Sequence, residues 1–209
     1  MADLINENDG FIEYSSKTDD LSQMQPIVQK KDFIFSRVQK HKYRVVTKIE
    51  NNNIQIKKVV DFHIIQLIFE INKEFFEKIH LDVNASGDNA YLCLMLRNLF
   101  EKIGFKQQCL SLQLTKVEPN ESTIVFVGNK DDTTINSYID AKKGNGFEII
   151  PLEKFTIISQ LHSNHLLELT MDIELADTKR KITYIVEKAF GMLLKHVFLK
   201  TKRFIEAIK

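Results

Sequence analysis

The residues best placed to do chemistry are basic side chains near the C-terminus, where lysines recur every seven positions. They are Lys181, Lys188, Lys195, Lys202 and Lys209. At about 100° per residue, a step of seven turns a helical position by only about −20°, so these side chains form a row along one helix. Such a row can bind phosphates or carboxylates. The residues that we expect to bind nucleic acid are Lys181, Lys188, Lys195, Lys202 and Arg203. The competing interpretation is a solvated helix face whose cations suit the helix dipole.

No group of residues in the sequence indicates catalysis. The chain contains no Walker loop, no Gly-x-Gly-x-x-Gly, no Gly-x-Ser-x-Gly and no Cys-x-x-Cys. Gly144-Asn145-Gly146 is better explained as a hairpin turn than as a phosphate loop. His162 and His165 have no cysteine or carboxylate close in sequence that would complete a zinc site. The loop between Asp82 and Asp88 is better explained as capped and solvated than as a cation site. We therefore expect no catalytic residue, no metal and no cofactor.

Charge divides the chain into an acidic N-terminal segment and a basic remainder. Residues 1–25 hold six carboxylates and one lysine, a net charge of −5. Because the whole chain of 209 residues carries +1, the other 184 residues carry +6. We predict that residues 1–25 form an acidic flexible tail outside the core, and that residues 26–209 form one domain.

Composition argues against a membrane or secreted protein. The longest apolar-looking run, residues 61–83, is interrupted by charged side chains, and no stretch reaches the roughly 18–20 apolar residues of a membrane span. The N-terminus resembles neither a secretory signal nor a transit peptide. Cys93 and Cys109, the only cysteines, are expected to be reduced thiols. We expect an intracellular protein, in cytoplasm, nucleus or virion, without a membrane partner.

Hydrophobic periodicity predicts an α+β fold, in which helices pack on antiparallel sheet and the chain ends in a long amphipathic helix. The predicted strands are 33–38, 43–49, 54–60, 80–83, 109–117, 123–127, 135–139, 147–150 and 166–175. The predicted helices are 61–78, 89–103, a segment from Pro151 to Leu161, and roughly 179–208. The β-branched residues of 61–78 leave a strand as the alternative there.

A shift of about ninety residues superimposes the apolar pattern of one half of the chain on the other. It pairs Ile34 with Ile124 and Ile68 with Ile158, among others, although identities are few. This predicts two pseudo-repeats, 31–105 and 121–209. The alternative is a single domain without internal repetition.

Two stretches resemble families of DNA machinery. Residues 89–117, with Lys102-Ile103-Gly104-Phe105 before a strand that begins at Leu110, resemble the boundary between repeats of the TATA-box-binding protein, a family that also repeats at close to ninety residues. Lys116 stands where that family keeps a DNA-contacting Asn, and the paired Phe wedges are missing, so no contact residue carries over. Residues 81–87 and 146–155 are similar to segments of DNA sliding clamps instead. The two resemblances exclude each other.

These observations predict a non-enzymatic binding protein. We expect a DNA-associated accessory factor of transcription or replication that uses a basic surface, with nucleic acid or an acidic protein surface as its partner. The alternative is a structural or assembly protein, such as a component of a large DNA virus, that docks another protein or a second copy of itself through the C-terminal helix.

Overall fold

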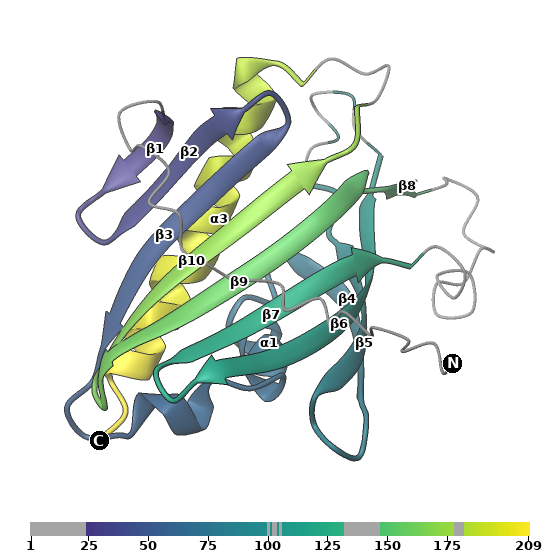
Figure 1. Cartoon of the computed structure of the whole chain (residues 1–209). Helices are drawn as coiled ribbons and strands as arrows, with labels where there is room; N and C mark the ends of the chain where they lie inside the picture. Colours follow the sequence, from purple (N-terminus) through teal and green to yellow (C-terminus); the bar gives the residue numbers. More distant parts are fainter. Residues whose placement is uncertain (1–23, 100, 102–103, 105, 132–146, 178–181) are drawn as a thin grey trace, which may run out of the picture.

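The computed structural model describes residues 24–99, 101, 104, 106–131, 147–177 and 182–209. In these residues a large sheet lies against one long helix, α3 (Figure 1). The strands are β1 (Gln25–Lys30), β2 (Phe33–Gln39), β3 (Lys42–Glu50), β4 (Phe76–Val83), β5 (Asn89–Leu96), β6 (Gln108–Asn120), β7 (Thr123–Lys130), β8 (Glu148–Ile149), β9 (Leu152–Ser163) and β10 (Leu166–Leu175). The helices are the short 3-10 helix η2 (Ile56–Val59), α1 (His63–Ile71) and α3 (Tyr184–Glu206).

The strand order places the first three strands of the described residues beside the last one. The order is β1-β2-β3-β10-β9-β7-β6-β5-β4, with every neighbouring pair antiparallel, and β8 pairs in parallel with the start of β6. Strands β1 to β3 therefore join the rest of the sheet through β10, the last strand in the described residues. The polypeptide between β3 and β4 contains η2 and α1, and it leads the chain from one half of the sheet to the opposite edge.

Alternation along the strands gives the sheet two unlike faces. On β3, the side chains of Tyr43, Val45, Thr47 and Ile49 are buried, whereas Lys42, Arg44, Val46 and Lys48 point to the other side. The buried set faces α3, as the aromatic pair Phe35–Phe190 between β2 and the helix shows, with ring centroids 6.1 Å apart. The face toward α3 is called the inner face below, and the opposite one the outer face.

Helix α3 begins at a capped end and packs closely on the N-terminal strands. Thr183 accepts a hydrogen bond from the backbone N–H of Val186, as an N-cap residue does. The helix then packs against β1, β2 and β3. Gly191 allows the closest approach, because a Cβ there would lie 2.5 Å from a ring carbon of Phe35. Farther along, Leu193 and Val197 pack with apolar residues at the ends of β4 and β5.

The α+β class, the large antiparallel sheet and the long C-terminal helix agree with the sequence prediction. The strands predicted at 33–38, 43–49, 109–117, 123–127 and 166–175 are all present. Three other predictions are wrong: residues 89–96 are strand β5 rather than helix, residues 152–163 are strand β9 rather than helix, and residues 56–59 are a 3-10 helix rather than strand. The helix predicted over 61–78 covers only residues 63–71, and β4 begins at Phe76.

The helix predicted at 89–103 failed because β5 is apolar on both faces. Leu92 and Leu96 belong to the inner face, and Cys93 and Met95 pack in a separate outer cluster with Tyr91 and other apolar residues. When both the odd and the even positions of a strand are apolar, some apolar residues are three or four positions apart in the sequence. This is also the spacing of the apolar stripe of a helix.

The structure does not support an internal duplication. The shift of ninety residues places helix α1 on strand β9, and it places the end of β5, residues 94–96, on the first turn of α3, so these paired segments have different secondary structure. The strand predicted at 135–139 and nearly all of the acidic segment 1–25 lie outside the described residues. No helix in the described residues is long and apolar enough to cross a membrane.

Candidate functional site

Apolar side chains of the inner face keep part of their surface accessible. The strand registers direct these side chains toward α3, yet each remains only partly buried: Phe155, Ile157 and Leu161 of β9, Leu169 of β10, Leu110 of β6, and Ile79, Leu81 and Val83 of β4. Because protein cores are close-packed, a side chain that faces the interior keeps accessible surface where a water-sized space adjoins it or where it lies at an open edge of the sheet, as on β4. The inner face is therefore less completely filled along these strands than at β1 to β3.

The fully buried part of the core marks where this space ends. Beneath α3, Phe33, Phe35 and Val45 have no exposed surface. Next to the start of α1, Phe62 packs edge-on against Phe126 of β7, with ring centroids 5.3 Å apart. The segment before α1 is held there by Lys57, whose ammonium group donates to the carbonyl oxygen of Glu121 at 3.0 Å. The partly accessible side chains thus lie between two closed regions of the core.

One buried hydroxyl group on the inner face has no hydrogen-bond partner. Ser159 of β9 lies between Ile124 of β7 and Leu169 of β10, and it is only 1% exposed. Its Oγ finds no partner in the part of the chain that the structure describes. An unsatisfied buried hydroxyl group costs free energy, so a polar group brought beside it would gain a hydrogen bond.

A charged cluster fixes the start of α3 to the inner face. The carboxylate of Glu187, which is 5% exposed, accepts hydrogen bonds from Arg37 Nε at 2.9 Å, from Arg37 Nη2, and from Tyr43 Oη at 2.9 Å. Burial, together with the bond to Glu187, raises the pKa of the Tyr43 phenol well above its ordinary value. The hydrogen bond to Glu187 also raises the pKa of Arg37. All three groups satisfy one another, so the cluster serves as an anchor for the helix.

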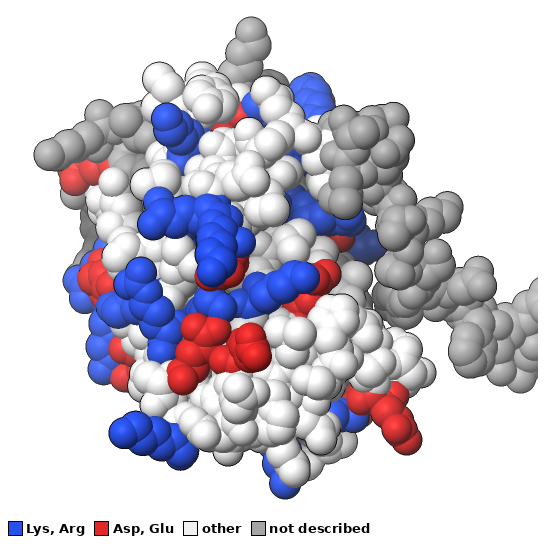
Figure 2. Space-filling model, turned by 90° about the vertical axis from the view of Figure 1, so that its left-hand side faces the viewer, with Lys and Arg blue, Asp and Glu red and all other residues white. Residues whose placement is uncertain are grey.

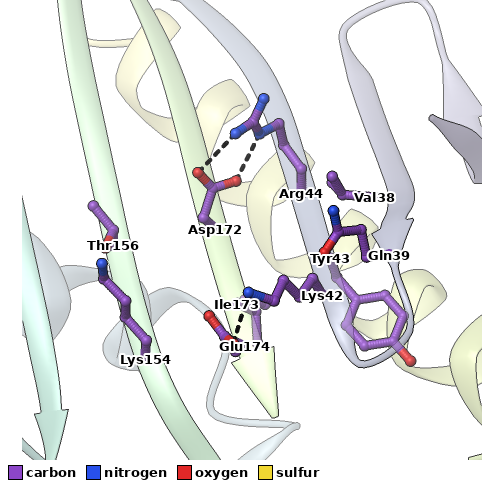
Figure 3. Close-up of a pocket in the computed structure, with 10 residues that line it drawn as sticks. All are labelled: Val38, Gln39, Lys42, Tyr43, Arg44, Lys154, Thr156, Asp172, Ile173 and Glu174. Carbon is purple, nitrogen blue, oxygen red and sulfur yellow. Dashed lines mark hydrogen bonds and ion pairs between the residues drawn. The ribbon is translucent and has the colours of Figure 1, made fainter. Parts of the chain in front are cut away.

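The outer face carries a hollow of about 370 Å³ whose lining includes several charged side chains (Figure 3). Lys42 of β3 pairs with Glu174 of β10 at 2.8 Å, and Arg44 Nε donates to Asp172 at 2.6 Å. Figure 3 shows both pairs crossing between these strands, with Lys154 and Thr156 of β9 beside them. Cross-strand ion pairs of this exposure contribute little to stability. Four of the charged groups in the hollow are thus paired with one another, and Val38, Tyr43 and Ile173 also contribute to its lining.

The structure does not align the predicted basic row as one open surface. Lys188 and Arg203 are exposed and Lys195 is half-buried, but Lys181 lies outside the described residues. The Lys202 side chain is only 12% exposed; its ammonium group donates to the carbonyl oxygen of Lys48 at 2.7 Å and pairs with Glu206. Figure 2 shows a face on which basic and acidic side chains lie next to one another among uncharged ones. Lys202 is therefore a packed side chain rather than a free phosphate contact.

The described residues contain no group of three or more His, Cys, Asp or Glu side chains that could hold a metal ion. His165 turns its Nδ1 toward the carbonyl oxygen of Ile54 at 2.9 Å, while His162 faces Glu168 at 3.7 Å. In the loop after β4, Asp88 accepts hydrogen bonds from Ser86 and Asn84, which agrees with a capped, solvated loop. Cys93 and Cys109 are free, buried thiols on neighbouring strands. Gly144-Asn145-Gly146 lies outside the described residues.

Comparisons with known proteins find similar structures but no similar sequences. No protein-family model matches the sequence, and no curated protein is similar enough in sequence to count as a relative. Among solved structures, human STARD10 superposes with a TM-score of 0.69 over 96% of this chain and 80% of its own, at 10% identity. Human StAR-related lipid transfer protein 5 gives 0.63 over 88% and 87%, at 8% identity. The lipid transfer and protein localization domain of human StarD13 gives 0.61 over 88% and 90%, at 9% identity.

These likenesses overturn both family resemblances that the sequence suggested. The strand order and the single long helix are not those of a TATA-box-binding-protein repeat or a sliding clamp. The DNA-associated function and the viral assembly role, with nucleic acid or an acidic protein as partner, are therefore wrong, since the solved structures that share this fold are lipid-transfer domains rather than DNA machinery or assembly proteins. The chain has the fold of the StAR-related lipid-transfer domains, in which a large antiparallel sheet grips a C-terminal helix.

Proposed function

We propose that this protein binds a hydrophobic small molecule, such as a lipid, between the inner face of the sheet and α3, and that it does so without catalysis. The observation that carries the proposal is the accessible apolar surface on inward-facing side chains such as Ile157, Leu161 and Leu169. Burying that surface against an apolar ligand contributes roughly 25 cal/mol per Å². The fold supports the same conclusion, because the solved structures that share it carry lipid transfer in their names.

The proposed ligand is mainly apolar with at least one polar group. Apolar side chains line the inner face on β4, β6, β9 and β10, and they select for hydrocarbon. The unpartnered Oγ of Ser159 lies within the same face, where a ligand hydroxyl or carbonyl group could bond to it once bound. The charged anchor of Glu187 is already satisfied, so we do not assign it to the ligand.

Two adjacent isoleucines provide a matched test. Ile157 faces inward opposite Phe126, whereas Ile158 faces outward opposite Val125, and both are partly buried. Ile157→Trp should fill ligand space and weaken the binding of a fluorescent fatty-acid analogue at least tenfold, while Ile158→Trp should leave that affinity within about twofold. Thermal unfolding of the two variants shows whether each is folded.

The stability of Ile157→Trp separates an open interior from a filled one. If space adjoins Ile157, the larger ring is accommodated and the unliganded variant unfolds near the parent temperature. A filled interior would be overpacked by the ring, which typically costs about 1–3 kcal/mol. Equal loss of probe affinity in both variants, or no binding by the parent protein, would contradict the proposal.

A further inference from the structure

The two edges of the sheet are protected to different degrees. Edge strand β1 is short, contains Pro26, and has a register shift between Pro26 and Val28, features that discourage pairing with another chain. Edge strand β4 contains no proline and pairs in unbroken register with β5 from Lys78 to Val83. Among the described residues, β5 is the only strand with which β4 pairs.

The register of β4 shows which of its backbone groups face away from β5. The backbone N–H of Asn84 donates to the carbonyl oxygen of Asn89 at 2.9 Å, so these opposite residues form a hydrogen-bonded pair. In an antiparallel ladder the direction of the backbone groups alternates. Asp82 and His80 thus turn theirs toward β5, and the N–H and C=O groups of Ile79 and Leu81 point outward from the edge.

The side chains of β4 complement those of a second β4 in antiparallel orientation. With His80 opposite His80 of the other copy, Lys78 of each copy lies opposite Asp82 of the other, which gives an opposite-charge pair on either side of the axis. Ile79 and Leu81 then lie opposite each other on the inner face. Moving the axis by one residue, to Ile79 or to Leu81, would remove both Lys78–Asp82 pairs, because His80 would then lie opposite Lys78 or opposite Asp82. The side chains therefore favour the register centred on His80.

We propose that β4 is an interface through which two copies of this chain associate, joining their sheets edge to edge. Ile79 and Leu81 of each copy exchange backbone hydrogen bonds with Leu81 and Ile79 of the other, and the Lys78–Asp82 pairs set the register. The proposal does not depend on the ligand, because the backbone groups involved belong to the edge of the sheet and not to the space under α3.

A charge-reversal experiment tests this interface. Sedimentation or light scattering at increasing protein concentration should show a monomer–dimer equilibrium for the parent chain. Lys78→Asp places like charges opposite each other twice, as does Asp82→Lys, and each substitution should weaken dimerisation by about tenfold or more. Lys30→Asp on the exposed end of β1 is the control and should leave the equilibrium unchanged.

Mixing the two single variants keeps the test independent of folding. An equimolar mixture of Lys78→Asp and Asp82→Lys again places opposite charges across the axis, so heterodimers should form at concentrations where each variant alone is monomeric. The double variant Lys78→Asp/Asp82→Lys should dimerise like the parent. A parent that stays monomeric throughout, or a dimer that neither single substitution weakens, would overturn the proposal.

Discussion

The inner and outer faces of strands β3, β10 and β9 are built from alternate residues of the same segments, yet they differ in what they leave unsatisfied. On the outer face, Lys42 and Arg44 pair with Glu174 and Asp172, and the hollow there contains both of these ion pairs. On the inner face, apolar side chains such as Leu169 retain accessible surface that no part of the described chain covers. The charged surface is more conspicuous in the sequence, but its paired groups gain less from binding a ligand than the accessible apolar surface of the inner face does.

The largest effect that we expect comes from breaking the inner-face anchor of α3. Arg37→Met would leave the Glu187 carboxylate buried without its cation, and should cost about 3 kcal/mol in the free energy of unfolding by urea. In Arg37→Met/Glu187→Gln the buried charge is gone, so most of this loss should be recovered. A double variant no more stable than Arg37→Met would show that the pair acts through packing instead.

A smaller loss should follow from filling the contact between α3 and the sheet. The Cβ added in Gly191→Ala meets Phe35 and Val28 at 2.5 and 2.9 Å, so the helix must shift outward. We expect a net cost of about 1–2 kcal/mol, because the better helix propensity of alanine offsets part of the overpacking. The neighbouring exposed residue provides the control: Met192→Ala should change stability by less than about 0.5 kcal/mol. Gly191→Ala at parent stability would refute the close approach.

The raised pKa of Tyr43 predicts how the anchor responds to alkali. The folded state keeps the phenol protonated above its ordinary pKa of about 10, so the folded state holds more protons than the unfolded one there and stability falls as pH rises past about 10. By pH 11 the stability advantage of the parent over Tyr43→Phe should have shrunk by about 1.4 kcal/mol relative to pH 8. An advantage that stays constant from pH 8 to 11 would mean that the phenol titrates normally.

The smallest effect should come from the outer face. Arg44→Gln removes the pair with Asp172 from a partly exposed position, and should cost no more than about 1 kcal/mol, with a smaller difference at high salt. It should not change the affinity for an apolar ligand. A large loss of ligand affinity in this variant would move the site from the inner face to the outer hollow.

The sequence predicted those elements whose apolar pattern is unambiguous. Residues 166–175 alternate cleanly and form β10, and the C-terminal helical stripe forms α3. β5 and β9 were mistaken for helices because they have apolar residues on both faces, so their spacing could not distinguish the two structures. The regular spacing of lysines near the C-terminus suggested a basic surface as the site. Long-range pairs such as Arg37–Glu187 could not be predicted, because their residues are too far apart in the sequence for local spacing to connect them.

The candidate site could not be found from the sequence for a physical reason. A side chain that lines a ligand site and one that fills a core are both apolar and inward-facing, so Ile157 and Val45 look alike in a pattern of alternation. They differ only in what packs against them. That depends on where α3 lies, which is fixed by contacts such as that of Gly191 with Phe35.

The central claim is that an apolar ligand contacts the inner face of the sheet, and methyl NMR tests it most directly. Spectra of protein labelled at Ile, Leu and Val methyl groups would be recorded while a fatty acid is added. The account predicts large chemical-shift changes at inward-facing Ile157, Leu161 and Leu169, and small ones at outward-facing Ile158 and Val117. Changes confined to the outward-facing methyl groups, or none at saturating fatty acid, would contradict it.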